Sequence, residues 1–280
     1  RDLVRSRGLG DVYKRQVSGN QSSVNSLFKW FDHQPSFYDI QVKYSNSNSL
    51  AFNRLKVRIK KEIVTMGETD IDPKNVVGTY IKPENWNDFI NDPETLIIDT
   101  RNEYEIAIGT FKNSTNPRTQ SFRDFPDWVK TELDSLPDNK RPKQIAMFCT
   151  GGIRCEKATS YLVKKGYDNV FHLEGGILKY LETIPEKDST WLGDCFVFDQ
   201  RVSLEHGLIP GKYKMCHACR LPLNPEDLKS KKYQPGISCP KCFGSHTPKQ
   251  EKRFKERQYQ VELARKRGVK HIGTRRGKRS

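Results

Sequence analysis

The sequence predicts an α/β fold built on a doubly wound parallel sheet, and three short, mainly apolar runs indicate its strands. Leu96–Asp99, Ile145–Phe148 and Val170–Leu173 lack polar alternation, which is typical of strands buried on both faces of a parallel sheet. Segments with apolar residues at helical spacing lie between and after these runs. Strands that alternate with helices predict parallel pairing.

Four helices are expected around these strands. The first begins near Pro83 and ends at Ile90, and the second lies within Phe122–Leu136. The third starts at Cys155, and the fourth spans Ile177–Glu182.

The chain divides into five segments by composition and pattern. These are residues 1–16, set aside as a scar; 17–78, a partial α+β domain; 79–190, the α/β domain; 191–248, a cysteine-rich module; and 249–280, a basic tail. The scar is inferred from Asp11–Gln16, which resembles the translated end of a sequencing adaptor. A short basic disordered arm is the alternative for 1–16.

The partial domain at 17–78 contains one expected helix and two expected strands. Asn20–Ser23 are candidate caps for the helix. The strands are expected at Ile40–Tyr44 and Leu55–Ile59. Lys56–Lys60 alternates between basic and apolar residues, which predicts a sheet face exposed to solvent or RNA.

Charge is distributed unevenly over the 280 residues, whose formal net charge is +15. Residues 249–280 hold 13 Lys and Arg against 3 Glu, whereas 17–248 carry only +2. A basic tail on a nearly neutral body favours a nucleic-acid partner. The alternative is a solvated tail without a ligand.

The composition excludes two classes of protein. No run of 18 apolar residues is present, so no membrane span is expected, and residues 1–16 lack the apolar core of a signal peptide. Four of the seven cysteines form two CxxC pairs, which indicates a metal site in a reducing compartment. We therefore expect a cytoplasmic protein.

A cysteine lies where the strand Ile145–Phe148 meets the next helix. The loop consists of Cys149, Thr150, Gly151, Gly152, Ile153 and Arg154. Backbone N–H groups, the helix dipole and the Arg154 charge should all favour the thiolate, which is the nucleophilic form. We therefore predict that Cys149 is catalytic. A buried structural cysteine is the alternative.

Two further residues are candidates for secondary roles at this loop. Asp99 ends the strand Leu96–Asp99 at the sheet edge where parallel sheets place their chemistry, so it is a plausible partner for a loop cation. Cys155 lies in the first turn of the following helix. It is either a resolving thiol or simply packed.

The position of Arg154 separates two kinds of cysteine loop. Cysteine phosphatases need an arginine six positions after the cysteine, whereas Arg154 lies five positions after Cys149. The loop resembles the rhodanese active-site loop, which cradles a cysteine persulfide. Asp99–Arg101 and Leu173–Gly176 have the order and spacing of a rhodanese domain, so the resemblance implies a rhodanese-like sheet.

The string CTGGIRCEKA at Cys149–Ala158, with HLEGGI at His172–Ile177, resembles one branch of that family, the rhodanese-domain tRNA uridine hydroxylases. This branch implies a ferredoxin-like domain before the rhodanese domain and a cysteine-rich region after it. Its N-terminal domain normally begins well before the position of Val17, so we expect an incomplete copy here. The resemblance implies hydroxylation of the wobble uridine of tRNA at C5, with molecular oxygen as co-substrate.

The residues are compatible with that activity, because a Cys149 thiolate could add to C6 of uracil and make C5 reactive towards oxygen. Two other functions stay open: a sulfurtransferase in which Cys149 carries a persulfide, and a non-enzymatic RNA-binding zinc module. The sequence holds no dinucleotide fingerprint or facial-triad histidine pair. No flavin, nicotinamide or iron site is therefore predicted.

The cysteine-rich module predicts a structural zinc site. Its ligands would be Cys216, Cys219, Cys239 and Cys242, two CxxC pairs separated by 19 residues. Four sulfurs close the coordination shell and leave no position for water. Reduced cysteines in a small loop-rich domain are the alternative, and His217 and His246 are spare ligands that four cysteines would not need.

The basic tail is the predicted RNA-binding segment. Its candidate residues are Lys252, Arg253, Lys255 and Arg257, interleaved with Phe254 and Tyr259. Basic and aromatic side chains together suit a phosphate backbone and unstacked bases. A charged helix in water is the alternative.

Overall fold

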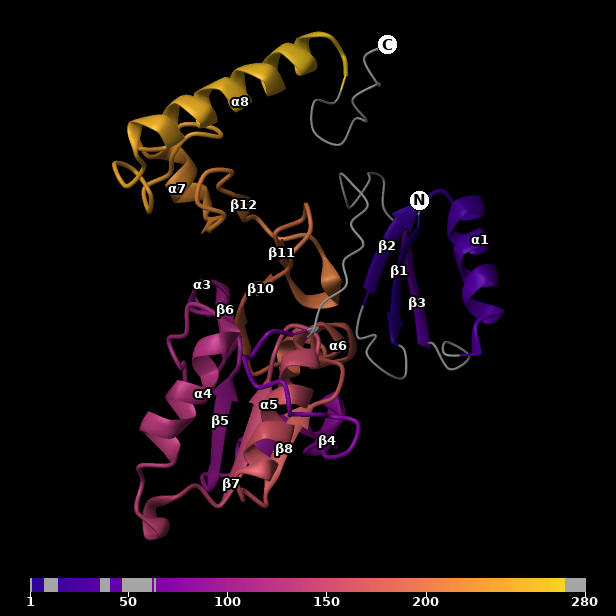
Figure 1. The fold of residues 1–280 in the computed structure, drawn as a ribbon, viewed down its shortest axis with the longest axis vertical. Helices are drawn as coiled ribbons and strands as arrows, with labels where there is room; N and C mark the ends of the chain where they lie inside the picture. The colour runs from indigo at the N-terminus through magenta and orange to yellow at the C-terminus, as the bar shows by residue number, and fades with distance from the viewer. Residues whose placement is uncertain (1, 8–14, 36–40, 47–61, 63, 270–280) are drawn as a thin grey trace. The chain divides into compact units, whose positions relative to one another are not determined.

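The computed structural model describes residues 2–7, 15–35, 41–46, 62 and 64–269 (Figure 1). Among the described residues, those up to 46, those from 62 to 197 and Leu204–Pro210 form one compact unit, whereas Phe198–Ser203 and residues 211–269 belong to a second.

The N-terminal segment forms a three-stranded antiparallel sheet with one helix. The strands β1 (Asp2–Arg7), β2 (Arg15–Gly19) and β3 (Gln41–Asn46) have the order β2-β1-β3. Helix α1 (Gln21–Asp32) begins after Asn20, whose Oδ1 accepts a hydrogen bond from the Ser23 N–H at 2.8 Å. The expected helix and the strand near Ile40–Tyr44 are confirmed.

Residues 2–7 form part of this sheet. The sequence sets residues 1–16 apart from the fold, but β1 lies between β2 and β3 and pairs with both. Strand pairing uses backbone N–H and C=O groups, so it does not depend on the origin of the segment, and the assignment of residues 1–16 as a scar stays a prediction. The strand expected at Leu55–Ile59 and the basic alternation at Lys56–Lys60 lie outside the described residues.

The central sheet is parallel, as predicted. Its strands are β4 (Thr79–Ile81), β5 (Thr95–Asp99), β7 (Gln144–Phe148) and β8 (Val170–Leu173), in the order β4-β8-β7-β5. Every pairing in it is parallel. Strand β4 is not among the strands that the sequence predicts, because its three residues are too few to show periodicity.

Helices cover both faces of this sheet. They are α2 (Pro83–Ile90), α3 (Glu103–Ile106), α4 (Phe125–Trp128), which continues as a π-helical turn (Val129–Leu133), α5 (Ile153–Lys164) and α6 (Gly176–Thr183). The alternation of β7 shows the two cores: Ile145 and Met147 pack with α4 and α5, whereas Ala146 and Phe148 pack with α2 and α6. The doubly wound α/β prediction is confirmed.

Residues just after the predicted boundary at 190 pack with the α/β domain. Strand β9 (Trp191–Gly193), assigned from sequence to the cysteine-rich module, pairs antiparallel with β6 (Gly109–Phe111). Trp191 and Cys195 pack in the core with Trp86. These contacts join residues 191–197 to the unit that holds the parallel sheet, and Leu204–Pro210 belongs to the same unit. The boundary at residue 190 stays a prediction.

The remaining elements are short, apart from one long helix. They are β10 (Cys195–Phe196), β11 (Ser203–Leu204), β12 (Lys214–Met215), β13 (Pro222–Leu223), α7 (Pro225–Lys229), α8 (Pro248–Lys266) and 3-10 turns at Phe122–Asp124, Asp138–Lys140, Glu186–Asp188 and His206–Leu208. Among the described residues, no helix combines the length and apolar character needed to cross a membrane.

Candidate active site and metal centre

The Cys149 loop is formed where β7 ends and α5 begins. Cys149 directly follows β7, and Gly152 precedes the helix with a φ of 91°, a left-handed conformation that favours glycine. This conformation turns the Gly152 N–H towards the cysteine, and it donates a hydrogen bond to Cys149 Sγ at 3.1 Å. The loop therefore supplies a backbone donor to the sulfur, as the sequence predicted.

A second glycine turn, at the start of α6, packs against the Cys149 loop. Gly176 has a φ of 68°, and a Cβ added there would lie 2.4 Å from the Cys149 carbonyl oxygen. The N–H groups of Ile177 and Leu178, in the first turn of α6, donate to the carbonyls of Cys149 and Thr150 at 3.0 and 3.1 Å. The close approach that fixes the loop therefore requires glycine at position 176.

The environment of Cys149 favours its thiolate. Burial alone would raise the pKa of this thiol, but a hydrogen bond from the Cys155 thiol, the Arg154 charge and backbone N–H groups lower the pKa well below its ordinary value. The loop sequence predicts two of these effects, the Arg154 charge and the backbone N–H groups. The side chain is only 2% exposed.

Cys155 has the opposite character. It is fully buried, and its sulfur lies 3.4 Å from Thr100 Oγ1 at the end of β5. Burial, together with the neighbouring Cys149 sulfur, raises the pKa of Cys155 well above its ordinary value. Cys155 is therefore a protonated thiol beside a thiolate.

Arg154 is held by a residue that the sequence did not single out. Its Nη1 and Nη2 atoms donate to the two carboxylate oxygens of Glu105, each at 2.7 Å. The Glu105 side chain is fully buried, and its Oε2 also accepts from the Asn102 N–H at 3.1 Å. Despite burial, the Arg154 charge lowers the pKa of Glu105, so the pair stays ionised.

Asp99 has a different partner from the one expected. Its carboxylate accepts hydrogen bonds from Arg101 Nε and Nη2 at 2.9 and 2.7 Å, and from Thr110 Oγ1 at 2.8 Å. Both members of this ion pair are fully buried. The expectation that Asp99 pairs with the loop cation Arg154 was therefore wrong, because Asp99 is engaged by the cation two residues later.

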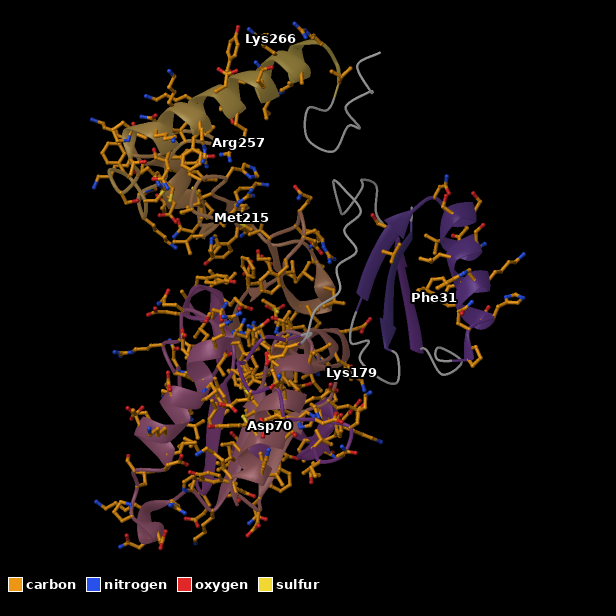
Figure 2. All side chains as sticks on the ribbon, in the orientation of Figure 1. Phe31, Asp70, Lys179, Met215, Arg257 and Lys266 are labelled. Carbon is orange, nitrogen blue, oxygen red and sulfur yellow. The ribbon has the colours of Figure 1, made fainter. Side chains whose placement is uncertain are left out.

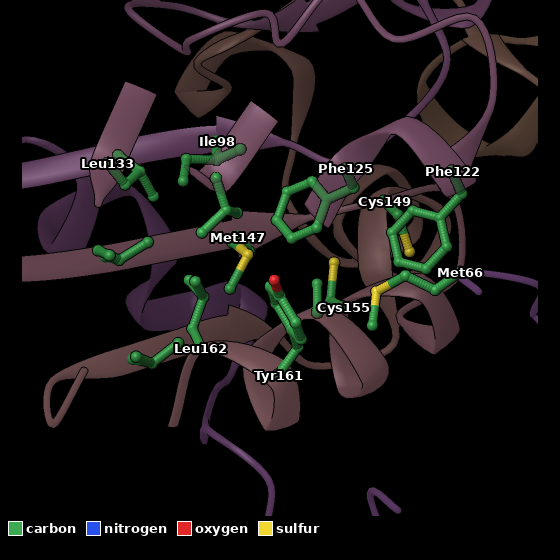
Figure 3. Packing of buried hydrophobic residues seen from close by; sticks show 14 of the residues in the cluster. Met66, Ile98, Phe122, Phe125, Leu133, Met147, Cys149, Cys155, Tyr161 and Leu162 are labelled. Atoms are coloured by element: carbon green, nitrogen blue, oxygen red, sulfur yellow. The ribbon is translucent and has the colours of Figure 1, made fainter. Parts of the chain in front are cut away.

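Apolar side chains cover the Cys149 sulfur. Met66 and Phe122 pack in the same cluster as Cys149 and Cys155, and Figure 3 shows all four side chains around one part of the core. Met66 belongs to a segment anchored by Glu62, whose Oε2 accepts from the Met66 N–H at 2.8 Å and whose Oε1 lies 3.4 Å from Lys157 Nζ. The Met66 side chain of this segment therefore packs in the same cluster as the Cys149 thiol.

The four CxxC cysteines converge in the second compact unit. The sulfur atoms of Cys216, Cys219, Cys239 and Cys242 all lie within 4.8 Å of one another. The sulfur–sulfur distances are 4.0 Å for Cys216–Cys242, 3.7 Å for Cys219–Cys239 and 3.6 Å for Cys239–Cys242. Tetrahedral thiolates at a Zn–S distance of about 2.3 Å would stand roughly 3.8 Å apart, so the cluster fits zinc.

Helix α8 presents three of the four predicted RNA-binding residues to solvent. Lys252, Arg253 and Lys255 are exposed. Arg257 instead donates from Nη2 to the backbone carbonyls of His217 and Gly236 at 2.9 and 2.8 Å, and so attaches α8 to the cysteine cluster's module (Figure 2).

The two aromatic residues of α8 also differ in exposure. Phe254 is buried against the ring of His246, at a centroid distance of 5.0 Å, whereas Tyr259 is 56% exposed. The interpretation of Phe254 as a base-stacking residue was therefore wrong.

Family models match two parts of the chain. Residues 82–183 match the rhodanese-like domain, and residues 15–63 match the UPF0176 acylphosphatase like domain. The first match covers the parallel sheet and the Cys149 loop, and the second includes α1 and β3.

Relatives match most of the chain. It is 51% identical over 257 residues to the tRNA uridine(34) hydroxylase of Acaryochloris marina (strain MBIC 11017), covering 92% of this chain and 82% of the relative. It is 50% identical to the tRNA uridine(34) hydroxylase of Rhizobium leguminosarum bv. trifolii (strain WSM2304), with the same coverage. The tRNA uridine(34) hydroxylase of Agrobacterium fabrum is also 50% identical, and 81% of its length is covered.

Proposed function

This chain belongs to the tRNA uridine(34) hydroxylase family, and we propose that it hydroxylates the wobble uridine of tRNA with Cys149 as the reacting thiolate. The observation that supports Cys149 most directly is the set of groups around its sulfur: the Gly152 N–H at 3.1 Å, the Cys155 thiol and the fixed Arg154 charge. A thiolate in such a setting is a nucleophile at neutral pH.

The proposed chemistry proceeds through the uracil ring. The Cys149 thiolate adds to C6, which places negative charge on the enolate formed by C5, C4 and O4. C5 then bonds to molecular oxygen, taken here as the co-substrate, and a proton completes a C5 hydroperoxide. Two electrons cleave the O–O bond, and loss of the C5 proton with expulsion of Cys149 gives 5-hydroxyuridine.

The metal and the RNA surface belong to the same proposal. Cys216, Cys219, Cys239 and Cys242 would hold a structural zinc ion that stabilises the module carrying α8. Lys252, Arg253 and Lys255 would then meet tRNA phosphates from that helix. Such an enzyme works in the cytoplasm, where tRNA is available and thiols stay reduced.

Nucleoside mass spectrometry of tRNA from a deletion strain tests this function. Complementation with the wild-type gene should restore 5-hydroxyuridine at position 34, and the Cys149→Ser variant should restore none, because the serine hydroxyl stays protonated at neutral pH. Loss of thiolated bases in the deletion strain would instead indicate a sulfurtransferase. Unchanged nucleosides would indicate a non-enzymatic RNA-binding module.

A further inference from the structure

The hydroxylation requires two electrons, and their donor is a chemical question that the proposed function leaves open. Molecular oxygen delivers one oxygen atom to the base and one to water, so each turnover consumes two electrons and two protons. Two thiols supply both when they form a disulfide. The chain places a second thiol beside the first: Cys155 lies six residues after Cys149, and the pair packs in one buried cluster.

The geometry points to Cys155 as a catalytic thiol that reduces the C5 hydroperoxide and then forms a disulfide with Cys149. This inference rests on the proposed function. Two observations carry it: Cys149 and Cys155 pack in the same buried cluster (Figure 3), and Thr100 Oγ1 lies 3.4 Å from Cys155 Sγ. The second thiol is therefore fixed beside the atom that bonds to the base.

The steps balance in atoms and electrons. The Cys155 sulfur attacks the terminal hydroperoxide oxygen, the O–O bond breaks, and the thiol proton passes to the oxygen left on C5. Cys155 becomes a sulfenic acid, oxidised by two electrons. Loss of the C5 proton releases the Cys149 thiolate, which attacks the Cys155 sulfur, forms the S–S bond and displaces hydroxide, which a proton converts to water. A small-molecule thiol then reduces the disulfide.

Charge explains why Cys155 would react after Cys149 and not before it. While Cys149 is a thiolate, its charge opposes ionisation of Cys155. Addition to C6 converts Cys149 into a neutral thioether and removes that charge. The Thr100 hydrogen bond and the Arg154 charge, which both lower the pKa of Cys155, then act unopposed by it. Burial meanwhile protects the resting thiol from oxidants in solution.

Cys195 provides a matched control. It is a third buried cysteine of the same compact unit, and burial raises the pKa of its thiol to about 12. Its sulfur donates to the Phe196 carbonyl at 3.7 Å, and it packs in the cluster on the opposite face of the sheet. Cys195→Ser therefore removes a buried thiol that the proposed chemistry does not use.

The test is a single round of reaction without added thiol. Reduced enzyme, freed of small thiols, is mixed in air with tRNA that carries unmodified uridine 34. We expect about one 5-hydroxyuridine per enzyme, with a Cys149–Cys155 disulfide in the tryptic peptides. Cys155→Ser and Cys155→Ala should reduce this first-round yield at least tenfold, whereas Cys195→Ser should match the wild type.

Two results would overturn the inference. One is a first-round yield of wild-type size in the Cys155 variants. The other is hydroxylation by the wild type without the disulfide, a readout that does not depend on how any variant folds. Failure of the proposed function is distinguishable, because the wild type would then form no 5-hydroxyuridine even when dithiothreitol is present.

Discussion

Arg154 acts on Cys149 from a fixed distance, because both terminal nitrogens of its guanidinium are bound by Glu105. A planar fork that satisfies two carboxylate oxygens cannot swing onto the thiolate and neutralise it in a tight ion pair. The Arg154 charge therefore lowers the pKa of Cys149 and leaves its sulfur free to react with a substrate. Glu105 is thus a positioning residue.

The first prediction concerns that fork. Arg154→Lys keeps the positive charge but cannot bind both Glu105 oxygens in the same planar geometry. One oxygen of the buried Glu105 carboxylate therefore loses its hydrogen bond from residue 154. We expect kcat for tRNA hydroxylation to fall by about 10²-fold. Near-normal turnover by Arg154→Lys would show that only a positive charge is required at this position.

The second prediction concerns pH. Because the Arg154 charge lowers the pKa of Cys149, Arg154→Gln should raise it, and the thiolate should then form only at higher pH. The measurement is the iodoacetamide alkylation rate of Cys149 against pH, followed by peptide mass spectrometry. The midpoint of the variant should lie above that of the wild type, and a midpoint at or below the wild-type value would contradict the assigned role.

Site residues could be predicted from the sequence only where a local pattern carries them. The glycines and arginine around Cys149 lie within six residues, so their joint effect could be read directly. Glu105 could not, because it lies 49 residues from Arg154 in a single-turn helix whose pattern suggests an exposed carboxylate. Asp99 was mistaken for the partner of Arg154 because strand ends indicate a sheet edge but not which side chains pair there.

At the scale of elements, the segment that contains Met66 bears most directly on access to the Cys149 thiol. With Cys149 only 2% exposed, a base cannot reach its sulfur unless a covering side chain moves. Met66 and Phe122 are the neighbours in the cluster, and the Glu62–Lys157 ion pair anchors the Met66 segment. For a base to reach the sulfur, a covering side chain such as Met66 or Phe122 must therefore shift.

The third prediction tests that access. Met66→Ala should accelerate alkylation of Cys149 several-fold, because it opens the cover, at a stability cost of about 2–5 kcal/mol. Leu133→Ala is the control: Leu133 is buried in the same cluster but away from the two sulfurs (Figure 3), so it should cost similar stability. Equal acceleration in both variants would mean that general loosening, not the Met66 cover, governs access.

The fourth prediction concerns the metal centre. Cys216→Ser or removal of zinc with a chelator should unfold the module around the four cysteines, because structural zinc supplies folding energy. Hydrogen exchange should rise from Gly211 onward while the rhodanese domain stays protected. His217→Ala, inside the same CxxC, is the control and should keep its metal. Loss of zinc from that variant would add a histidine to the ligand set.

At the scale of the whole molecule, most of the net positive charge and the proposed catalytic cysteine lie in different parts of the chain. Residues 249–280 carry most of the net charge, and the Cys149 loop belongs to a nearly neutral domain. Long-range attraction of tRNA should come from the tail and α8, whereas turnover should depend on the rhodanese domain.

The fifth prediction separates those two contributions. Removing residues 249–280 should weaken tRNA binding and flatten its salt dependence by about 0.7–0.9 in the slope of log K against log salt for each phosphate that the protein no longer neutralises. Hydroxylation at saturating tRNA should remain. Replacing Lys252, Arg253 and Lys255 by glutamine should give part of the effect without disturbing Arg257. An unchanged slope would move the RNA site to Lys56, Arg58 and Lys60.

The main sheet, its helices and the cysteine cluster could be predicted from the sequence, whereas the pairing of the shortest strands could not. The parallel sheet, its helices and the four-cysteine cluster follow from periodicity and spacing. The pairing of β9 with β6 could not be predicted, because β9 is three residues long and β6 lies about 80 residues earlier. The pairing of residues 2–7 with β2 and β3 could not be predicted, because backbone pairing leaves little trace in the side-chain pattern.

Covalent capture of the base tests the role of Cys149 most directly. In tRNA with 5-fluorouridine at position 34, fluorine favours addition at C6, and after oxygen bonds to C5 no C5 proton remains to allow expulsion of the thiolate. Mass spectrometry of the digested complex should place the nucleotide on Cys149 in the wild type and on no residue in Cys149→Ser. An adduct on another residue, or hydroxylation of ordinary tRNA by Cys149→Ser, would contradict the account.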